Sequence, residues 1–268
     1  MKRLIDIELF KLRNTRYFWV LGSLFLTFLI LVPVGGRLFL NYLGSIGEVM
    51  NGISLGDLPL FDFVDIWQNL TWVYKWFSIL LGFIVIISIS NEYTYTTLRQ
   101  GVIDGLSRKD ILVSKLGMIF LTSLFFSVVV LLIGLVCGFL WSPVTGMSFI
   151  MKNITFVPAY FLHLFAFQLF CLFVGLLVRK SGVSIALVMF YTFVEWIIHL
   201  FLRFDFKFEM AAELLPVISI GNLIRLPFAK YGLQETQTYV AGFDVLVVFV
   251  YIALLIFGCY KLLQSRDL

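Results

Sequence analysis

The sequence predicts an all-α membrane protein with six transmembrane helices, and three observations lead to this prediction. Of 268 residues, 61% are hydrophobic and 13% are charged, whereas soluble domains average roughly 45–50% and about 25%. No Asp, Glu, Lys or Arg occurs between Lys115 and Lys152, or from Asn153 to Val178. A helix needs only about 20 apolar residues to cross a bilayer core. The apolar runs are also continuous rather than alternating, which excludes a β-barrel.

The six predicted spans follow one another in a single transmembrane domain, residues 1–268. Each is rich in Leu, Ile, Val and Phe, and they cover residues 17–34, 69–90, 117–141, 157–178, 183–202 and 243–263. Aromatic residues such as Trp19, Trp76 and Trp141 collect near their ends. Such a distribution is typical of the aromatic belts at the two membrane surfaces.

Residues 1–16 are predicted to form a cytoplasmic N-terminal helix ahead of the first span. A secretory signal is disfavoured because the segment contains Asp6 and Glu8 and no A-x-A-like site follows. Placed at 100° per residue, the segment shows no clean apolar stripe, since Ile7 and Phe10 share a face with Arg3. An interfacial helix with snorkelling basic side chains remains open.

The distribution of Lys and Arg predicts the orientation. Six spans place both termini on one side. Of the 20 Lys and Arg residues, 13 fall on that side, in residues 1–16, 91–115, 179–182 and 261–268. Because positive residues are enriched in cytoplasmic loops, both termini are predicted to be cytoplasmic.

The predicted outer loop at 203–242 contains an unusual apolar segment. Residues 211–228 are interrupted by Pro216, Gly221 and Pro227, and are too short to cross the bilayer. We expect this segment to form interfacial or re-entrant helices. A loop packed on the outer surface of the bundle is the alternative.

The chain lacks the common catalytic and metal-binding motifs. There is no phosphate-binding G-x-x-x-x-G-K-[ST] loop, no H-E-x-x-H and no G-x-S-x-G. The two histidines cannot build a multi-histidine metal site, and Cys137, Cys171 and Cys259 fall in apolar segments as small hydrophobic residues. No stretch is basic enough for nucleic acid. We therefore expect no catalytic residue, no metal and no cofactor bound by this chain.

Residues 91–115 are predicted to form a cytoplasmic coupling segment. Charged residues there alternate with Leu98, Val102, Ile103 and Leu106. This mixture is typical of a short helix on the membrane surface that docks onto a cytoplasmic partner. A solvated loop that only maintains the topology is equally compatible with the composition.

Glu195 is the one acidic residue well inside a predicted span, and His199 follows one turn later on the same face. Ionisable residues inside membranes usually face a bundle interior or a wet cavity. One hypothesis is that this pair lines a translocation pathway or senses protons. The alternative is a neutral Glu195 with a structural hydrogen bond to His199 or a neighbouring helix. Lys75 is interpreted as snorkelling to the interface.

Segment 91–115 resembles the corresponding loop of ABC-2 type permeases, the membrane subunits of ABC transporters. The matching positions are Glu92, Thr96-Thr97-Leu98-Arg99, Ser107-Arg108 and Lys115, and Thr96 stands where that family usually has Gly. The layout of the chain is also similar: an N-terminal helix, six spans and a broken hydrophobic segment before the last span. The C-terminal residues 261–268 are similar too.

The resemblance implies an ABC-2 (type V exporter-like) permease fold in the bacterial cytoplasmic (inner) membrane. It implies that this chain is not an enzyme and pairs with a second permease subunit, as a homodimer or heterodimer, and with cytoplasmic ABC ATPase subunits. ATP-Mg would bind to the ATPase, and an amphiphilic, lipid-like or peptide/drug substrate would be exported among membrane lipids. The implied ATPase-coupling residues are Glu92, Thr97, Leu98, Arg99, Ser107 and Arg108.

Two other functions remain open on the sequence. One is a stand-alone carrier or channel driven by an ion gradient, with Glu195 and His199 as its proton site, which predicts activity without any ATPase. The other is an ATPase-coupled membrane subunit that transmits force to a partner protein. That function predicts a partner at the outer loops and no solute flux.

Overall fold

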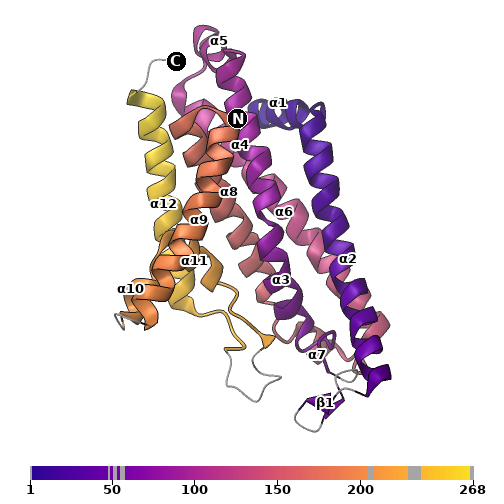
Figure 1. Cartoon of the computed structure of the whole chain (residues 1–268). Coiled ribbons are helices and arrows are strands. Elements are labelled where there is room, and N and C mark those ends of the chain that lie inside the picture. Colours follow the sequence, from indigo (N-terminus) through magenta and orange to yellow (C-terminus); the bar gives the residue numbers. More distant parts are fainter. Residues whose placement is uncertain are drawn as a thin grey trace.

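The computed structural model describes residues 2–47, 49–50, 53–54, 58–204, 208–228 and 237–265, and is predominantly helical (Figure 1). Within these residues, six helical stretches are long and apolar enough to cross a membrane. They are Arg16–Ile46 (α2), Ile66–Thr94 (α3 and α4), Arg108–Trp141 (α6), Met147–Val178 (α7 and α8), Ser181–Phe204 (α9) and Gly242–Ser265 (α12). The predicted number of candidate spans is confirmed, and it indicates a multi-pass membrane protein.

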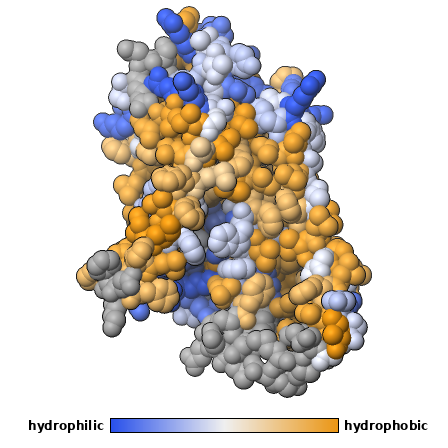
Figure 2. Space-filling model, viewed as in Figure 1, coloured by the Kyte–Doolittle hydropathy of each residue, from blue (hydrophilic) through white to orange (hydrophobic). Residues whose placement is uncertain are grey.

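The two ends of the bundle differ in what they carry. The terminal end holds α1 (Lys2–Arg13), α5 (Thr97–Ile103) and the last turn of α12, whereas the distal end holds α7 (Met147–Met151) and α10 (Glu209–Glu213) (Figure 1). Figure 2 shows hydrophobic residues over the middle of one face and hydrophilic residues gathered at the terminal end. This pattern matches a bundle whose middle lies in hydrocarbon.

A small hairpin at the distal end adds to the predicted all-α fold. Strands Val49–Met50 (β1) and Ile53–Ser54 (β2) pair in antiparallel register. They follow α2, which ends at Gly47 with a left-handed backbone (φ 78°), the conformation that glycine adopts most readily.

The structure corrects the predicted boundaries of two spans. Helix α2 continues past the buried Pro33 to Ile46, so the loop that follows is much shorter than the sequence suggested. The second span is split at Ser78 into α3 (Ile66–Phe77) and α4 (Ile79–Thr94). Proline and glycine are tolerated in membrane helices because neighbouring groups satisfy the freed backbone, which is why Pro33 does not end α2.

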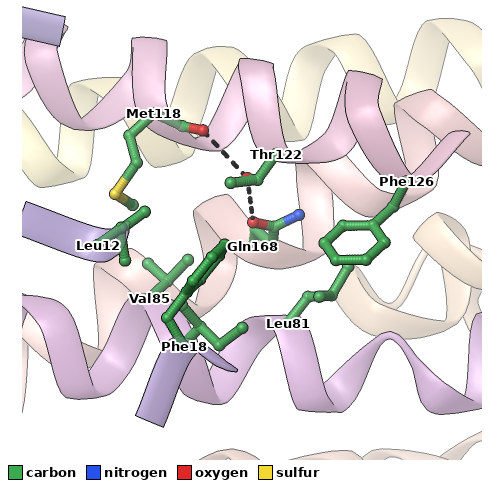
Figure 3. A pocket seen from close by; sticks show the side chains of 9 residues that line it. Leu12, Phe18, Leu81, Val85, Met118, Thr122, Phe126 and Gln168 are labelled. Atoms are coloured by element: carbon green, nitrogen blue, oxygen red, sulfur yellow. Dashed lines mark hydrogen bonds between the residues drawn. The ribbon is translucent and has the colours of Figure 1, made fainter. Parts of the chain in front are cut away.

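Helix α8 (Phe156–Val178) lies at the centre of the bundle and contacts α3, α4, α6, α9, α11 and α12. It carries one buried amide, Gln168, whose Oε1 accepts a hydrogen bond from Thr122 (3.0 Å) and whose Nε2 donates to Ser123 Oγ (2.9 Å). Figure 3 shows this amide beside a void of about 10 Å³. The void has about the volume needed for one water.

Glycines bring α6 close to the start of the second span. A Cβ on Gly138 would lie 2.3 Å from the Phe63 ring, and one on Gly134 would lie 2.6 Å from the Trp67 ring. Both rings are almost fully buried. Small residues of this kind allow close helix packing in membranes, where packing itself drives association.

We therefore predict that Gly138→Ala destabilises the protein by about 1–3 kcal/mol, because the added methyl group overpacks the contact with Phe63. The midpoint of thermal unfolding in detergent measures the effect. Gly35→Ala in α2 is the matched control, since nothing lies within 4 Å of its added methyl group. Equal midpoints for the two variants would contradict the packing assignment.

Candidate functional site

The segment between α4 and α6 is folded differently from a single surface helix. Helix α4 ends at Thr94, α5 covers only Thr97–Ile103, and a second turn precedes α6. Thr96, in the first turn, has φ 55°, a left-handed conformation that favours glycine. Thr96 stands where ABC-2 type permeases usually have Gly, and its backbone conformation in this chain is one that favours Gly.

Helix α5 has one buried anchor and an exposed outer surface. The Leu98 side chain is 5% exposed, whereas Ile103 is 74% exposed, and Tyr95 in the turn before α5 is 70% exposed. Arg99 and Thr97 are also exposed. Of the predicted coupling residues on α5, Thr97 and Arg99 can reach a partner, and Leu98 instead fixes α5 to the bundle.

Glu92 lies in a charge cluster formed by Glu8, Lys11, Glu92 and Lys115, in which Lys11 is half exposed and the other three are buried. Its Oε1 accepts hydrogen bonds from Lys11 Nζ (3.0 Å) and Lys115 Nζ (2.7 Å). Glu8 Oε1 accepts from Lys11 Nζ (2.8 Å), and Glu8 Oε2 accepts from Lys115 Nζ. The two acidic and two basic side chains neutralise one another, and they join α1, α4 and α6.

The sequence singled out only two of the four residues of the charge cluster. Glu92 and Lys115 are among the positions that carry the family resemblance, but the sequence predicted no function for Glu8 or Lys11. The sequence signal that could have found them is the missing apolar stripe of residues 2–16. Glu8 and Leu12 form the buried side of α1, whereas Phe10 is 67% exposed.

The ion pairs in the cluster determine the protonation of Glu8 and Lys11. Burial alone raises the pKa of Glu8, but the ammonium groups of Lys115 and Lys11 outweigh it and hold that pKa below its ordinary value of 4.5. Burial lowers the pKa of Lys11, and the carboxylates of Glu92 and Glu8 outweigh it and raise that pKa above 10.5. Both groups are therefore charged at neutral pH.

Ser107 and Arg108 contact neighbouring parts of this chain. Ser107 Oγ accepts from Asp110 N (3.1 Å), and the Asp110 carboxylate accepts from Ser107 N (3.2 Å), a capping box that starts α6. Arg108 Nη1 donates to Leu263 O (2.5 Å) and to Gln264 O, at the end of α12. Sequence reasoning singled out both residues but missed that Arg108 links α6 to α12.

The second candidate pair, Glu195 and His199, lies toward the distal end. Glu195 Oε1 accepts from Val217 N (2.7 Å) and Ile218 N (2.9 Å), in the first turn of α11 (Pro216–Asn222). His199 Nδ1 lies at hydrogen-bond distance, 3.1 Å, from Ala212 O. Among the described residues no hydrogen bond joins Glu195 to His199.

Lys75 and His163 also contact the segment around α11. Lys75 Nζ donates to Gly221 O (2.9 Å) and Ile224 O (2.7 Å), and His163 Nδ1 lies 3.0 Å from Ile220 O. The interpretation of Lys75 as a snorkelling residue did not include these contacts. Helix α11 packs against α8, α9 and α12, and Ile220 and Ile224 are fully buried. The broken segment is thus built into the bundle.

A cavity of about 680 Å³ lies where α3, α4, α8, α9 and α11 meet. Its lining includes Lys75, Trp76, Phe193, Trp196, His199 and Asn222. Figure 2 shows a hollow with hydrophilic residues inside it on the face that carries α9 and α11. Within the described part of the chain, no group of three His, Cys, Asp or Glu side chains could hold a metal ion.

We predict that Lys115→Met destabilises the protein by about 3–5 kcal/mol, because it leaves two buried carboxylates with only Lys11 as a partner. Thermal unfolding in detergent measures the loss. Adding Glu8→Gln to Lys115→Met restores charge balance and should recover part of the stability. Lys109→Met, at an exposed position of the same helix, is the control and should cost less than about 1 kcal/mol.

The lowered pKa of Glu8 also predicts a dependence of stability on pH. The ionised carboxylate contributes stability that is complete above the unfolded pKa of 4.5 and is lost as the pH falls through the lower, folded pKa. Between about pH 5 and about pH 3 the free energy of unfolding of the wild type should fall more steeply than that of Glu8→Gln. Parallel pH profiles of the two proteins would contradict this assignment.

Residues 28–268 match a protein family described as a protein of unknown function, DUF2705. No curated protein matches the chain. The match begins inside α2 and includes Glu92, Lys115, α5 and the cavity. Because it covers most of the sequence, the chain belongs to the DUF2705 family.

Proposed function

We propose that this protein is the permease subunit of an ATP-driven ABC exporter in the bacterial cytoplasmic membrane, with the terminal end of the bundle in the cytoplasm. The observation that carries the proposal is the exposed surface of α5 and of the turn before it. Helix α5 is short, lies at the terminal end, is anchored by Leu98 and exposes Arg99 and Ile103. The exposed Tyr95 lies in the turn that precedes it. Exposed apolar side chains beside a basic one are typical of a surface that binds another protein.

The contacts around α5 support a mechanical role. Helix α5 follows α4 directly, and Glu92 near the end of α4 is bonded to Lys11 of α1 and Lys115 of α6. Arg108, at the start of α6, is bonded to the end of α12. A displacement of α5 therefore reaches four other helices through hydrogen bonds and ion pairs.

In the proposed mechanism the work is divided between chains. A separate ATPase binds ATP-Mg and docks on α5 through Thr97 and Arg99. Glu92, Ser107 and Arg108 transmit the movement into α1, α4, α6 and α12. The movement changes the tilt of this subunit against a second permease subunit and exports an amphiphilic substrate. The low burial of α9, the least buried of the six candidate spans, supports a neighbouring subunit in the membrane.

The contacts of Glu195 and His199 favour this function over an ion-driven carrier. Both side chains bond to backbone groups of residues 212–218, and these bonds provide a structural reason for two ionisable residues inside a span. The buried Glu195 Oε2 has no hydrogen-bond partner among the described residues, and it is a feature that the proton-site hypothesis would still explain.

The test is to purify the tagged protein from its native host and measure Mg-ATP hydrolysis in the purified assembly. The expected partner is a chain with a G-x-x-x-x-G-K-[ST] loop, identified by mass spectrometry. The double variant Arg99→Ala, Ile103→Asp should reduce the retained ATPase by about tenfold or more, equivalent to roughly 1.4 kcal/mol of binding free energy.

Lys152→Ala is the control, because Lys152 is exposed at the distal end and should leave the retained ATPase unchanged. Equal thermal unfolding midpoints would show that the α5 variant is folded. Transport by the purified chain in vesicles without any ATPase would contradict the proposal. An assembly that hydrolyses ATP and moves no solute would favour force transmission to a partner protein instead.

A further inference from the structure

The lining of the cavity is polar near the distal end of the bundle and apolar near its middle. Helices α3–α4 and α8 run from the distal end toward the terminal end, and along them Lys75 precedes Ile79 and His163 precedes Phe167. Helix α9 runs the opposite way, and there Met189 precedes His199. All three walls therefore change from polar near the distal end to apolar near the middle of the bundle.

Lys75 gives the polar part of the cavity a positive charge. Its ammonium group has three N–H donors, and two of them are used by Gly221 O and Ile224 O. Both of these acceptors are uncharged. Among the described residues no ion pair involves Lys75, and none of the described residues that line the cavity is acidic.

The described acidic side chains that contact α11 or Arg225 have partners within this chain. Glu195 caps α11 through Val217 N and Ile218 N. Arg225 binds Glu213 (3.2 Å) and Asp244 (3.3 Å). Lys75 Nζ also lies 5.7 Å from the centroid of the Trp72 ring, but its third N–H donates no hydrogen bond among the described residues. That N–H can bind a ligand, and an anion is the ligand that a cation in a low-dielectric setting binds most strongly.

Other side chains fit the two halves of such a ligand. His199 Nδ1–H donates to Ala212 O, which leaves Nε2 of the neutral ring as an acceptor for a hydroxyl of the headgroup. Trp76 and Trp196 are 60% and 48% exposed, as expected of residues at the depth of lipid headgroups. A volume of about 680 Å³ is in the usual range for small-molecule sites, roughly 300–1,000 Å³.

We propose that this cavity binds an anionic lipid of the surrounding bilayer, with the headgroup at Lys75 and His199 and a hydrocarbon chain between Ile79, Phe167 and Met189. The lipid enters sideways, since the cavity is open on the face seen in Figure 2. The inference deepens the proposed function by naming an anionic lipid as the class of substrate. Only this identification as substrate rests on the proposed function. Binding itself needs no ATPase.

The test uses the full chain purified in a neutral detergent and titrated with phosphatidylglycerol or with phosphatidylcholine of the same chains. Native mass spectrometry counts the lipids retained. The wild type should bind phosphatidylglycerol at least about tenfold more tightly than phosphatidylcholine. Lys75→Gln should remove this preference, because it keeps hydrogen-bond donors and deletes the charge.

Lys152→Gln is the matched control, a lysine at the same end of the bundle but outside the cavity, and it should keep the preference. Thr192→Phe, which fills the cavity without changing charge, should weaken binding of both lipids. Equal binding of phosphatidylglycerol by the wild type and Lys75→Gln would overturn the proposal, as would equal binding of the two lipids by the wild type.

The two proposals fail separately. Full retention of the ATPase by the variant Arg99→Ala, Ile103→Asp contradicts only the role of α5. A wild type that retains its ATPase but shows no preference for phosphatidylglycerol contradicts only the cavity. If Lys75→Gln fails to fold, Thr192→Phe alone must lower binding of phosphatidylglycerol for the proposal to stand.

Discussion

Every backbone N–H and C=O group that lies in hydrocarbon must find a partner inside the protein, and this constraint shapes the whole molecule. Continuous helices meet it without help. The segment around α10 and α11 cannot, because Pro216 and two turns interrupt it. Polar side chains from four spans therefore bond to its backbone: Lys75, His163, Glu195, His199 and Tyr251. The ionisable residues inside the spans therefore serve to satisfy the backbone of the interrupted segment around α10 and α11.

At the terminal end, buried charges rather than backbone groups need partners inside the protein. Lys115 and Glu92 are almost completely buried, and removing either from water is unfavourable unless the other charges are near. Glu8 and Lys11 complete the balance from α1. Together with the buried Leu12, the cluster holds the N-terminal helix against the bundle, while its Ile7 and Phe10 are exposed. The two polar networks thus lie at opposite ends of an apolar bundle.

The candidate spans could be predicted closely because each depends on local composition. The predicted ends at Val178 and Trp141 coincide with helix ends. Contacts between distant residues could not be predicted, since periodicity carries no information about which residue of another helix lies opposite. Glu8 and Lys115 are 107 positions apart, and nothing local indicates that they meet. The turn at Thr96 was noticed as a departure from Gly, but its left-handed backbone became visible only in three dimensions.

The separation of the charge cluster along the chain has a consequence for biosynthesis. Helix α1 precedes its partners in the chain, because Glu92 lies at the end of the second span and Lys115 near the start of the third. At about 5–20 residues per second, the ribosome needs roughly 5–20 s to reach Lys115 after it has made Glu8. During that interval the ion pair between Glu8 and Lys115 cannot form. The charge cluster is therefore completed only when the start of the third span has been made.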